Sequence, residues 1–235
     1  DITTIMNNIK GQPSNTPADD PGDMVQYIEA HDNLTLHDVI AQSIKKDPAI
    51  EENELEIQKR IRLGNMLILT SQGTSFLQAG QEYGRTKQWL GTGIPQDKFT
   101  EMKDQDNTSF GYFIHDSYDS SDAVNMFDWT QATDEVQFPV QNMTREYTTG
   151  LIELRKSTDA FRLGDKSLVE SNVTLIPSVD IKATDLVIGY KNKATDGTGI
   201  YYVFMNADTA SRSLTLSEDL TSGKVVVDND EAGIV

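Results

Sequence analysis

Apolar side chains recur at helical spacing in three stretches of the chain. The clearest pattern is that of Ile57, Ile61 and Ile68, which fall near one face of a helix whose acidic first turn suits the helix dipole. The other two stretches repeat the pattern with leucine, isoleucine and tyrosine. The predicted helices run from Thr35 to a stop at Asp47, from about Glu51 to Ser71, and from Thr144 to about Phe161.

Two short apolar segments, Val25–Ala30 and Ser75–Ala79, alternate with these helices. The order is strand, helices, strand, and the helices are long enough to serve as crossovers between parallel strands. Residues 85–140 are rich in Gly, Asp, Ser and Asn and are expected to be mostly loop.

The hydrophobic period changes after Gly164, where short strand-like segments follow one another. The candidates are 173–178, 185–192, 199–207, 211–217 and 224–228. Between the second and third lies the sequence TDGTG, which is typical of a hairpin turn. The pattern therefore predicts an α/β part, residues 1–165, and an all-β part, residues 166–235.

Charge and composition exclude several classes of partner. The formal net charge is −17, with 37 acidic against 20 basic residues, so no basic patch for nucleic acid or for an anionic membrane surface is expected. The chain has no cysteine, which excludes disulfides and thiolate metal sites. No apolar run reaches the ~18 residues that a membrane helix needs.

Polar side chains follow each of the two predicted parallel strands. His31 and Asp32 come directly after the first strand, and Gln81, Glu82 and Tyr83 follow the second. Because functional groups gather at the carboxyl ends of parallel strands, we expect these side chains on one face. A purely structural interpretation is also open, in which His31 is a core histidine and Asp32 caps the next helix.

Three segments carry a resemblance to a known family. YIEAHDN (27–33) resembles the segment at the seventh barrel strand of the α-amylase superfamily of glycoside hydrolases. AGQEYGRTK (79–87) and HDSYDSSDAVNMFDW (115–129) resemble the following segments of its debranching enzymes, the pullulanases. The resemblance implies the last two β/α units of a (β/α)8 TIM barrel, followed by a C-terminal antiparallel β-sandwich. The sandwich would be truncated in this chain.

The resemblance also assigns roles to the polar residues at the strand ends. Asp32 would grip sugar hydroxyls and stabilise an oxocarbenium-like transition state, and His31 would donate a hydrogen bond to the same sugar. The remaining expected substrate-binding residues are Tyr27, Asn33, Glu82, Tyr83 and Asn125. For Glu82, an ion pair at the end of the barrel is an equally open interpretation.

Two catalytic groups of the family have no counterpart in this sequence. Neither a GFRxD segment with the nucleophile nor a GExW segment with the general acid occurs. The chain is therefore expected to begin inside the barrel, and to be an inactive fragment of a retaining enzyme that cleaves α-1,6-glucosidic bonds in pullulan, glycogen or branched dextrins. A non-catalytic polysaccharide-binding module and a piece of an isoamylase or α-amylase are the alternatives.

The expected partners are an α-glucan and either the remaining barrel segments or a second copy of the chain. No cofactor is expected. The acidic stretches 101–108 and 116–122 could hold Ca²⁺, although solvated surface loops are the favoured interpretation. The resemblance, together with the absence of cysteine, places the parent protein outside the cell or on the surface of a Gram-positive bacterium.

Overall fold

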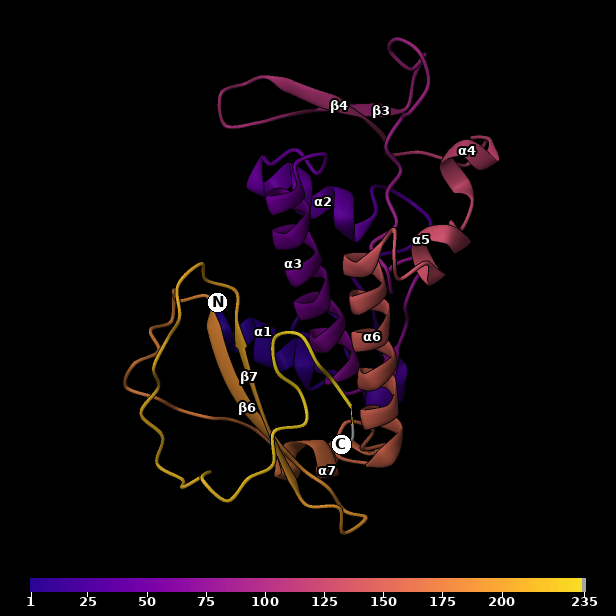
Figure 1. Ribbon diagram of the computed structural model, residues 1–235. Helices are drawn as coiled ribbons and strands as arrows, with labels where there is room; N and C mark the ends of the chain where they lie inside the picture. The colour runs from indigo at the N-terminus through magenta and orange to yellow at the C-terminus, as the bar shows by residue number, and fades with distance from the viewer. Residues whose placement is uncertain (234–235) are drawn as a thin grey trace.

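The computed structural model describes residues 1–233 and contains helices, two small two-stranded sheets and one three-stranded sheet (Figure 1). The helices are α1 (Ile2–Ile9), the 3₁₀ helix η1 (Pro21–Asp23), α2 (Leu36–Ile44), α3 (Glu51–Leu69), α4 (Asp122–Asn125), α5 (Trp129–Thr133), α6 (Pro139–Ser157) and α7 (Lys166–Asn172). The strands are β1 (Val25–Gln26), β2 (Thr74–Ser75), β3 (Phe99–Lys103), β4 (Ser109–Ile114), β5 (Val173–Leu175), β6 (Val187–Lys193) and β7 (Ile200–Asn206).

Strands β1 and β2 pair in parallel, as the order of elements predicts. Val25 lies opposite Thr74 and Gln26 opposite Ser75. Both strands are shorter than the predicted segments Val25–Ala30 and Ser75–Ala79. Each strand has a single paired neighbour among the described residues, and regular pairing stops where the chain bends after Gln26.

Helices α3 and α6 lie side by side and run in the same direction (Figure 1). Asn65 Nδ2 donates to Thr148 Oγ1 at 3.0 Å, and further along both helices Arg155 donates to the carbonyl oxygen of Leu69 at 3.0 Å. The residues that the periodicity places on the apolar faces are buried, which confirms both helices. Helix α6 begins earlier than predicted, at Pro139, a residue suited to the first helical turn.

An antiparallel hairpin, β3–β4, occupies part of the region predicted to be loop, so that prediction is wrong for residues 99–114. Phe99 lies opposite Ile114, and Asp104 shapes the turn by accepting from the backbone N–H groups of 106 and 108. The hairpin contributes Met102 and Phe113 to a core shared with α2 and α3. The aromatic and apolar residues of β4, together with burial against these helices, favour strands within a region that is otherwise rich in turn-forming residues.

The β-rich part is one three-stranded antiparallel sheet rather than the predicted sandwich. The β6–β7 hairpin is confirmed, with the Ala194 N–H donating to the carbonyl oxygen of Gly199 at 2.9 Å. Segments 211–217 and 224–228 form no strand apart from one bridge, Val227 to Ala232. Helices cover the sheet face that a second sheet would cover, because residues of α1, α6 and α7 share its core cluster.

Candidate functional site

The residues after β1 form an exposed loop that presents His31 and Asp32 to solvent. The side chains of His31 and Asp32 are 80% and 79% exposed, and His31 Nε2 lies 3.5 Å from Asp32 Oδ1. Asn33 has φ of 63°, a left-handed conformation that asparagine tolerates, and it turns the chain towards α2. Tyr27 is also exposed, and its ring makes an edge-on contact with the ring of Phe76, which directly follows β2.

Both structural explanations offered for the His-Asp pair are wrong. A core histidine would be buried, whereas His31 is largely exposed. The N-cap of α2 is Thr35, whose hydroxyl oxygen accepts from the Asp38 N–H at 3.2 Å. Neither packing in the core nor capping of a helix therefore explains why His31 and Asp32 occur at this position.

Segment 79–87 forms hydrogen bonds to the loop that carries His31 and Asp32. The ammonium of Lys87 donates to the carbonyl oxygens of His31 and Asn33, both at 2.8 Å. The Lys87 N–H and the Thr86 hydroxyl donate to the two carboxylate oxygens of Asp38, at 2.8 and 2.5 Å. The first two segments that resemble the glycoside hydrolases therefore meet in space.

The third segment, 115–129, is joined to the same centre. The Tyr83 hydroxyl oxygen accepts from the Asp128 N–H at 3.0 Å, and Arg85 donates to the carbonyl oxygen of Val124 at 3.0 Å. Tyr83 is fully buried, so it supports this segment and presents no surface to a ligand. The Asn125 amide donates to the carbonyl oxygens of Ser117 and Ser120, at 2.7 and 3.1 Å, and is committed to shaping its own loop.

Glu82 is half-buried and accepts from the Gly80 N–H at 2.7 Å, which stabilises the turn after β2. Within residues 1–233 it makes no ion pair, so the expectation of a barrel-end salt bridge is wrong for this chain. Glu82 keeps one oxygen free of the turn.

A buried charged cluster beneath the loop has no counterpart in the sequence-based prediction. His37 Nδ1 lies 2.9 Å from Asp38 Oδ1, and His37 Nε2 lies 2.8 Å from Glu54 Oε2. Burial by itself would lower the pKa of His37, but the hydrogen bonds to Asp38 and Glu54 raise it to about 10. The imidazolium thus donates to one carboxylate from each ring nitrogen and joins α2 to α3.

Glu29 is the second titratable group under the loop. One of its carboxylate oxygens accepts from the Leu36 N–H at 2.8 Å, at the start of α2, while the other is buried without a partner. Burial raises the pKa of Glu29 to about 7, against the opposing effect of the Leu36 hydrogen bond. No sequence pattern indicated that Glu29 would be buried.

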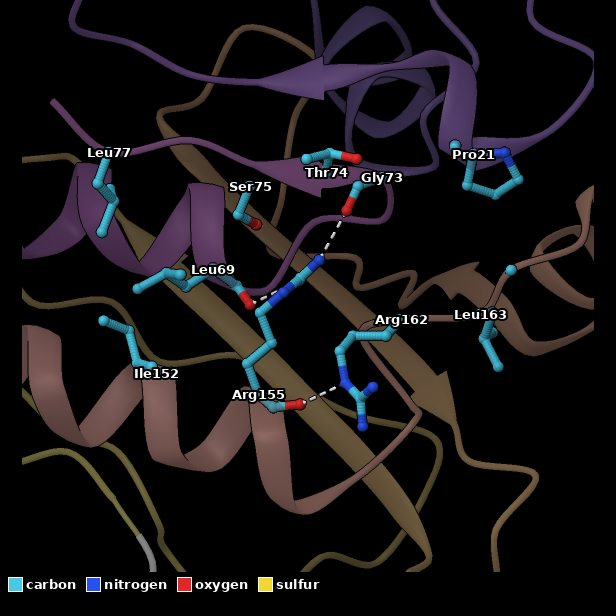
Figure 2. Close-up of a pocket in the computed structure, with 12 residues that line it drawn as sticks. Pro21, Leu69, Gly73, Thr74, Ser75, Leu77, Ile152, Arg155, Arg162 and Leu163 are labelled. Atoms are coloured by element: carbon cyan, nitrogen blue, oxygen red, sulfur yellow. Dashed lines mark hydrogen bonds between the residues drawn. The ribbon is translucent and has the colours of Figure 1, made fainter.

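A cavity of about 510 Å³ lies elsewhere, between β2 and α6, and none of the predicted site residues lines it (Figure 2). Residues 1–233 contain no group of three or more His, Cys, Asp or Glu side chains placed to hold a metal ion. In the same part of the chain, no helix has the length and apolar character needed to cross a bilayer. The candidate site is the exposed loop at His31 and Asp32, because segments 79–87 and 115–129 meet around it.

The whole chain aligns with Pullulanase A of Streptococcus pneumoniae, with 49% identity over 251 residues. The chain is homologous to the C-terminal region of pullulanases. A family model described as SpuA C-terminal matches residues 172–235. Among solved structures, the catalytic module of the glycogen-degrading pneumococcal virulence factor SpuA superposes on all of the chain with a TM-score of 0.94 and 48% identity.

A second solved pullulanase, SAP of Group B Streptococcus in complex with maltotetraose, matches 99% of the chain with a TM-score of 0.89 and 51% identity. The chain spans only part of these proteins: 19% of pneumococcal Pullulanase A, 35% of the SpuA catalytic module and 31% of SAP. The recognition of a pullulanase from three short segments is confirmed, because the likeness covers the chain from end to end.

Proposed function

We propose that residues 1–235 form part of the catalytic module of a retaining glycoside hydrolase that cleaves α-1,6-glucosidic linkages in pullulan, glycogen or branched dextrins. The observation that carries this proposal is the meeting of three pullulanase-like segments around one exposed His-Asp pair, held by Lys87, Tyr83 and Arg85. The similarity to pullulanases along the whole chain supports it.

In this proposal residues 1–165 supply the last two β/α units of a TIM barrel and residues 166–235 supply the C-terminal β domain. The parallel β1–β2 pair and the co-directional helices α3 and α6 support the first assignment. The side chains of Val25, Tyr27 and Phe76 are exposed on these strands, as expected if neighbouring barrel segments or a second copy cover them.

Asp32 is the proposed catalytic group of this part of the module. Its carboxylate would accept hydrogen bonds from sugar hydroxyls, and these bonds strengthen as the ring flattens and positive charge develops. His31 would donate to a neighbouring hydroxyl, with Tyr27, Asn33 and Glu82 at the border of the sugar site. Tyr83 and Asn125, expected to bind substrate, would instead support the loops around it. The nucleophile and the general acid would come from segments outside this chain. The parent enzyme would act outside the cell or at its surface.

The test uses a complete enzyme, in which residues 1–235 replace the homologous C-terminal region of pneumococcal Pullulanase A. We expect Asp32→Asn to lower kcat on pullulan by about 10²- to 10⁴-fold with little change in KM, since it removes an interaction that is strongest in the transition state. His31→Ala should cost less, because a neutral donor contributes less to a cationic transition state.

The matched control is Asp106→Asn, which removes another exposed carboxylate, from the β3–β4 turn. That variant should retain the kcat of the unsubstituted chimera. A kcat for Asp32→Asn close to that of the control, in enzymes with equal melting temperatures, would remove Asp32 from the chemistry.

A further inference from the structure

Lys87 is a buried cation whose ammonium binds backbone oxygens. Its side chain is 1% exposed, and its two acceptors are the carbonyl oxygens of His31 and Asn33. These two residues are the neighbours of Asp32 on either side. The ammonium therefore grips the main chain immediately before and immediately after the proposed catalytic carboxylate.

Burying the Lys87 ammonium has an unfavourable free energy. Moving an ammonium out of water requires compensation, which is normally an ion pair. Among residues 1–233, no carboxylate lies within salt-bridge distance of the Lys87 ammonium. Burial, and next the Arg85 guanidinium, lower the pKa of Lys87, whereas nearby carboxylates that include Asp32 act in the opposite direction. Stability alone would be served as well by an apolar side chain of similar volume.

The loop has little else to hold it. In the described part of the chain, no backbone-to-backbone hydrogen bond involves residues 27–34. Asn33 adopts a left-handed conformation, and the Asp32 side chain has only His31 within reach, at 3.5 Å. Glu29 accepts from the Leu36 N–H, and Leu34 packs against the core of α2 and α3, but both contacts lie towards the ends of the loop. The Lys87 ammonium is the restraint that acts on the main chain beside Asp32.

We propose that Lys87 is a positioning residue, which fixes the backbone on both sides of Asp32 so that the carboxylate meets the sugar in the geometry of the transition state. This inference rests on the proposed function. Misplacement of a reacting group by about 1 Å can cost about 10²-fold in rate, so the grip of Lys87 has a measurable kinetic consequence.

Arg155 provides a matched control, because it is a second buried cation that binds backbone oxygens. Its guanidinium donates to the carbonyl oxygens of Leu69, Ser71 and Gly73 at 3.0, 2.7 and 2.7 Å, and it is 9% exposed (Figure 2). These contacts join the ends of α3 and α6, away from the Asp32 loop. Arg155→Met thus measures the effect of removing a buried cation that binds backbone carbonyl oxygens, without changing the proposed site.

The experiment compares Lys87→Met and Arg155→Met in the pullulanase chimera, each with and without Asp32→Asn. Lys87→Met should lower kcat on pullulan about 100-fold with a smaller change in KM, and more than Arg155→Met does. In the Asp32→Asn background, Lys87→Met should lower kcat by less than about threefold, because both substitutions remove the same interaction. Lys87→Arg, which keeps the charge and the donors, should retain more of kcat than Lys87→Met.

A measurement without activity accompanies the kinetics. In the 235-residue chain, Lys87→Met should lower the NMR backbone order parameters of residues 31–34 and leave amide exchange in α6 unchanged, while Arg155→Met should speed amide exchange in α6 and leave the order parameters of residues 31–34 unchanged. The kinetics of these variants distinguish the positioning role of Lys87 from the proposed function. If Asp32→Asn leaves kcat unchanged, the proposed function falls and the positioning role falls with it. If Asp32→Asn lowers kcat but Lys87→Met matches Arg155→Met, or if the losses in the double variant multiply, only the positioning role is overturned.

Discussion

Replacing His37 by glutamine tests the buried charged cluster on which the candidate site stands. His37 bridges Asp38 at the start of α2 and Glu54 in the first turns of α3. Glutamine can donate to one carboxylate but carries no charge, so two acidic side chains would face each other without a cation between them. The His37→Gln chain should therefore lose stability, and the loss should be centred on α2.

The raised pKa of His37 gives the expected size of this loss of stability. A pKa that rises from 6.5 in the unfolded chain to about 10 in the folded chain corresponds to about 5 kcal/mol of stabilisation, at about 1.4 kcal/mol per pH unit. Breaking a buried ion pair from one side costs about 3–5 kcal/mol. Because Glu54 is 18% exposed and keeps some solvation, we expect about 3 kcal/mol.

The sign of the pH dependence follows from the raised pKa of the folded state. The stabilisation is complete below pH 6.5 and is lost as the pH rises through about 10. Urea unfolding followed by circular dichroism, at pH 6 and at pH 9, would measure the difference between the original chain and His37→Gln. That difference should be largest at pH 6 and shrink by about 1–3 kcal/mol at pH 9.

His115→Gln is the matched control, because His115 is half-buried and has one neutral partner, Thr100 Oγ1 at 3.1 Å. It should cost about 1 kcal/mol or less, with little change between the two pH values. Equal losses from the two histidines, or a His37 effect that does not change with pH, would show that His37 is neutral and that the ion-pair reasoning is wrong.

Two further predictions concern the isolated chain. It should show no turnover of pullulan, because it lacks the nucleophile and the general acid. It should also give no heat on calorimetric titration with maltotriose, because part of a barrel forms only part of the sugar site; binding would instead favour a stand-alone polysaccharide module. Burial raises the pKa of Glu29 to about 7 from 4.5, so its contribution to stability is present below pH 4.5 and is lost by up to about 3 kcal/mol as the pH rises through 7. Glu29→Gln should abolish this loss in urea titrations at pH 4.5 and 7.5, and an unchanged pH profile would show that Glu29 is solvated.

Sequence patterns predicted the features that depend on a single stretch of chain. Ile57, Ile61 and Ile68 lie at helical spacing within one segment and all three are buried on α3. The turn at TDGTG was likewise read from neighbouring residues, and the parallel order of β1 and β2 was inferred from the helices that connect them. Such features need no knowledge of what packs against them, because period and turn chemistry are local.

Features that depend on distant partners were not predicted. The sandwich prediction assumed that strand-like segments pair with one another, but α1, from the start of the chain, covers the sheet together with α6 and α7. The β3–β4 hairpin was hidden by the Gly-, Asp-, Ser- and Asn-rich sequence around it, although Met102, Phe113 and Phe110 pack against the core of α2 and α3. A sequence pattern states which face is apolar, but not which element will cover it.

The candidate site divides in the same way. The motif that contains His31 and Asp32 was visible because its residue types are unusual at the end of a strand. The residues that hold this motif were not, because a lysine or a histidine in a polar sequence is usually solvated. Lys87 is 56 positions from His31 in sequence and Glu54 is 17 positions from His37, and each pair is joined by one hydrogen bond.

The arrangement has a physical logic that links these two groups of residues. A carboxylate that must act on sugar hydroxyls has to remain exposed, so its loop cannot be fixed by burying its own side chains. The loop then has to be fixed by hydrogen bonds to its backbone oxygens and by its connection to α2, the helix that follows. Lys87 supplies the first restraint, and Asp38, which binds both segment 86–87 and His37, ties that restraint to α2 and α3. In the proposed site, buried charges at His37, Asp38 and Lys87 therefore support an exposed loop, and these charges are the feature of the fold that packing alone would not select.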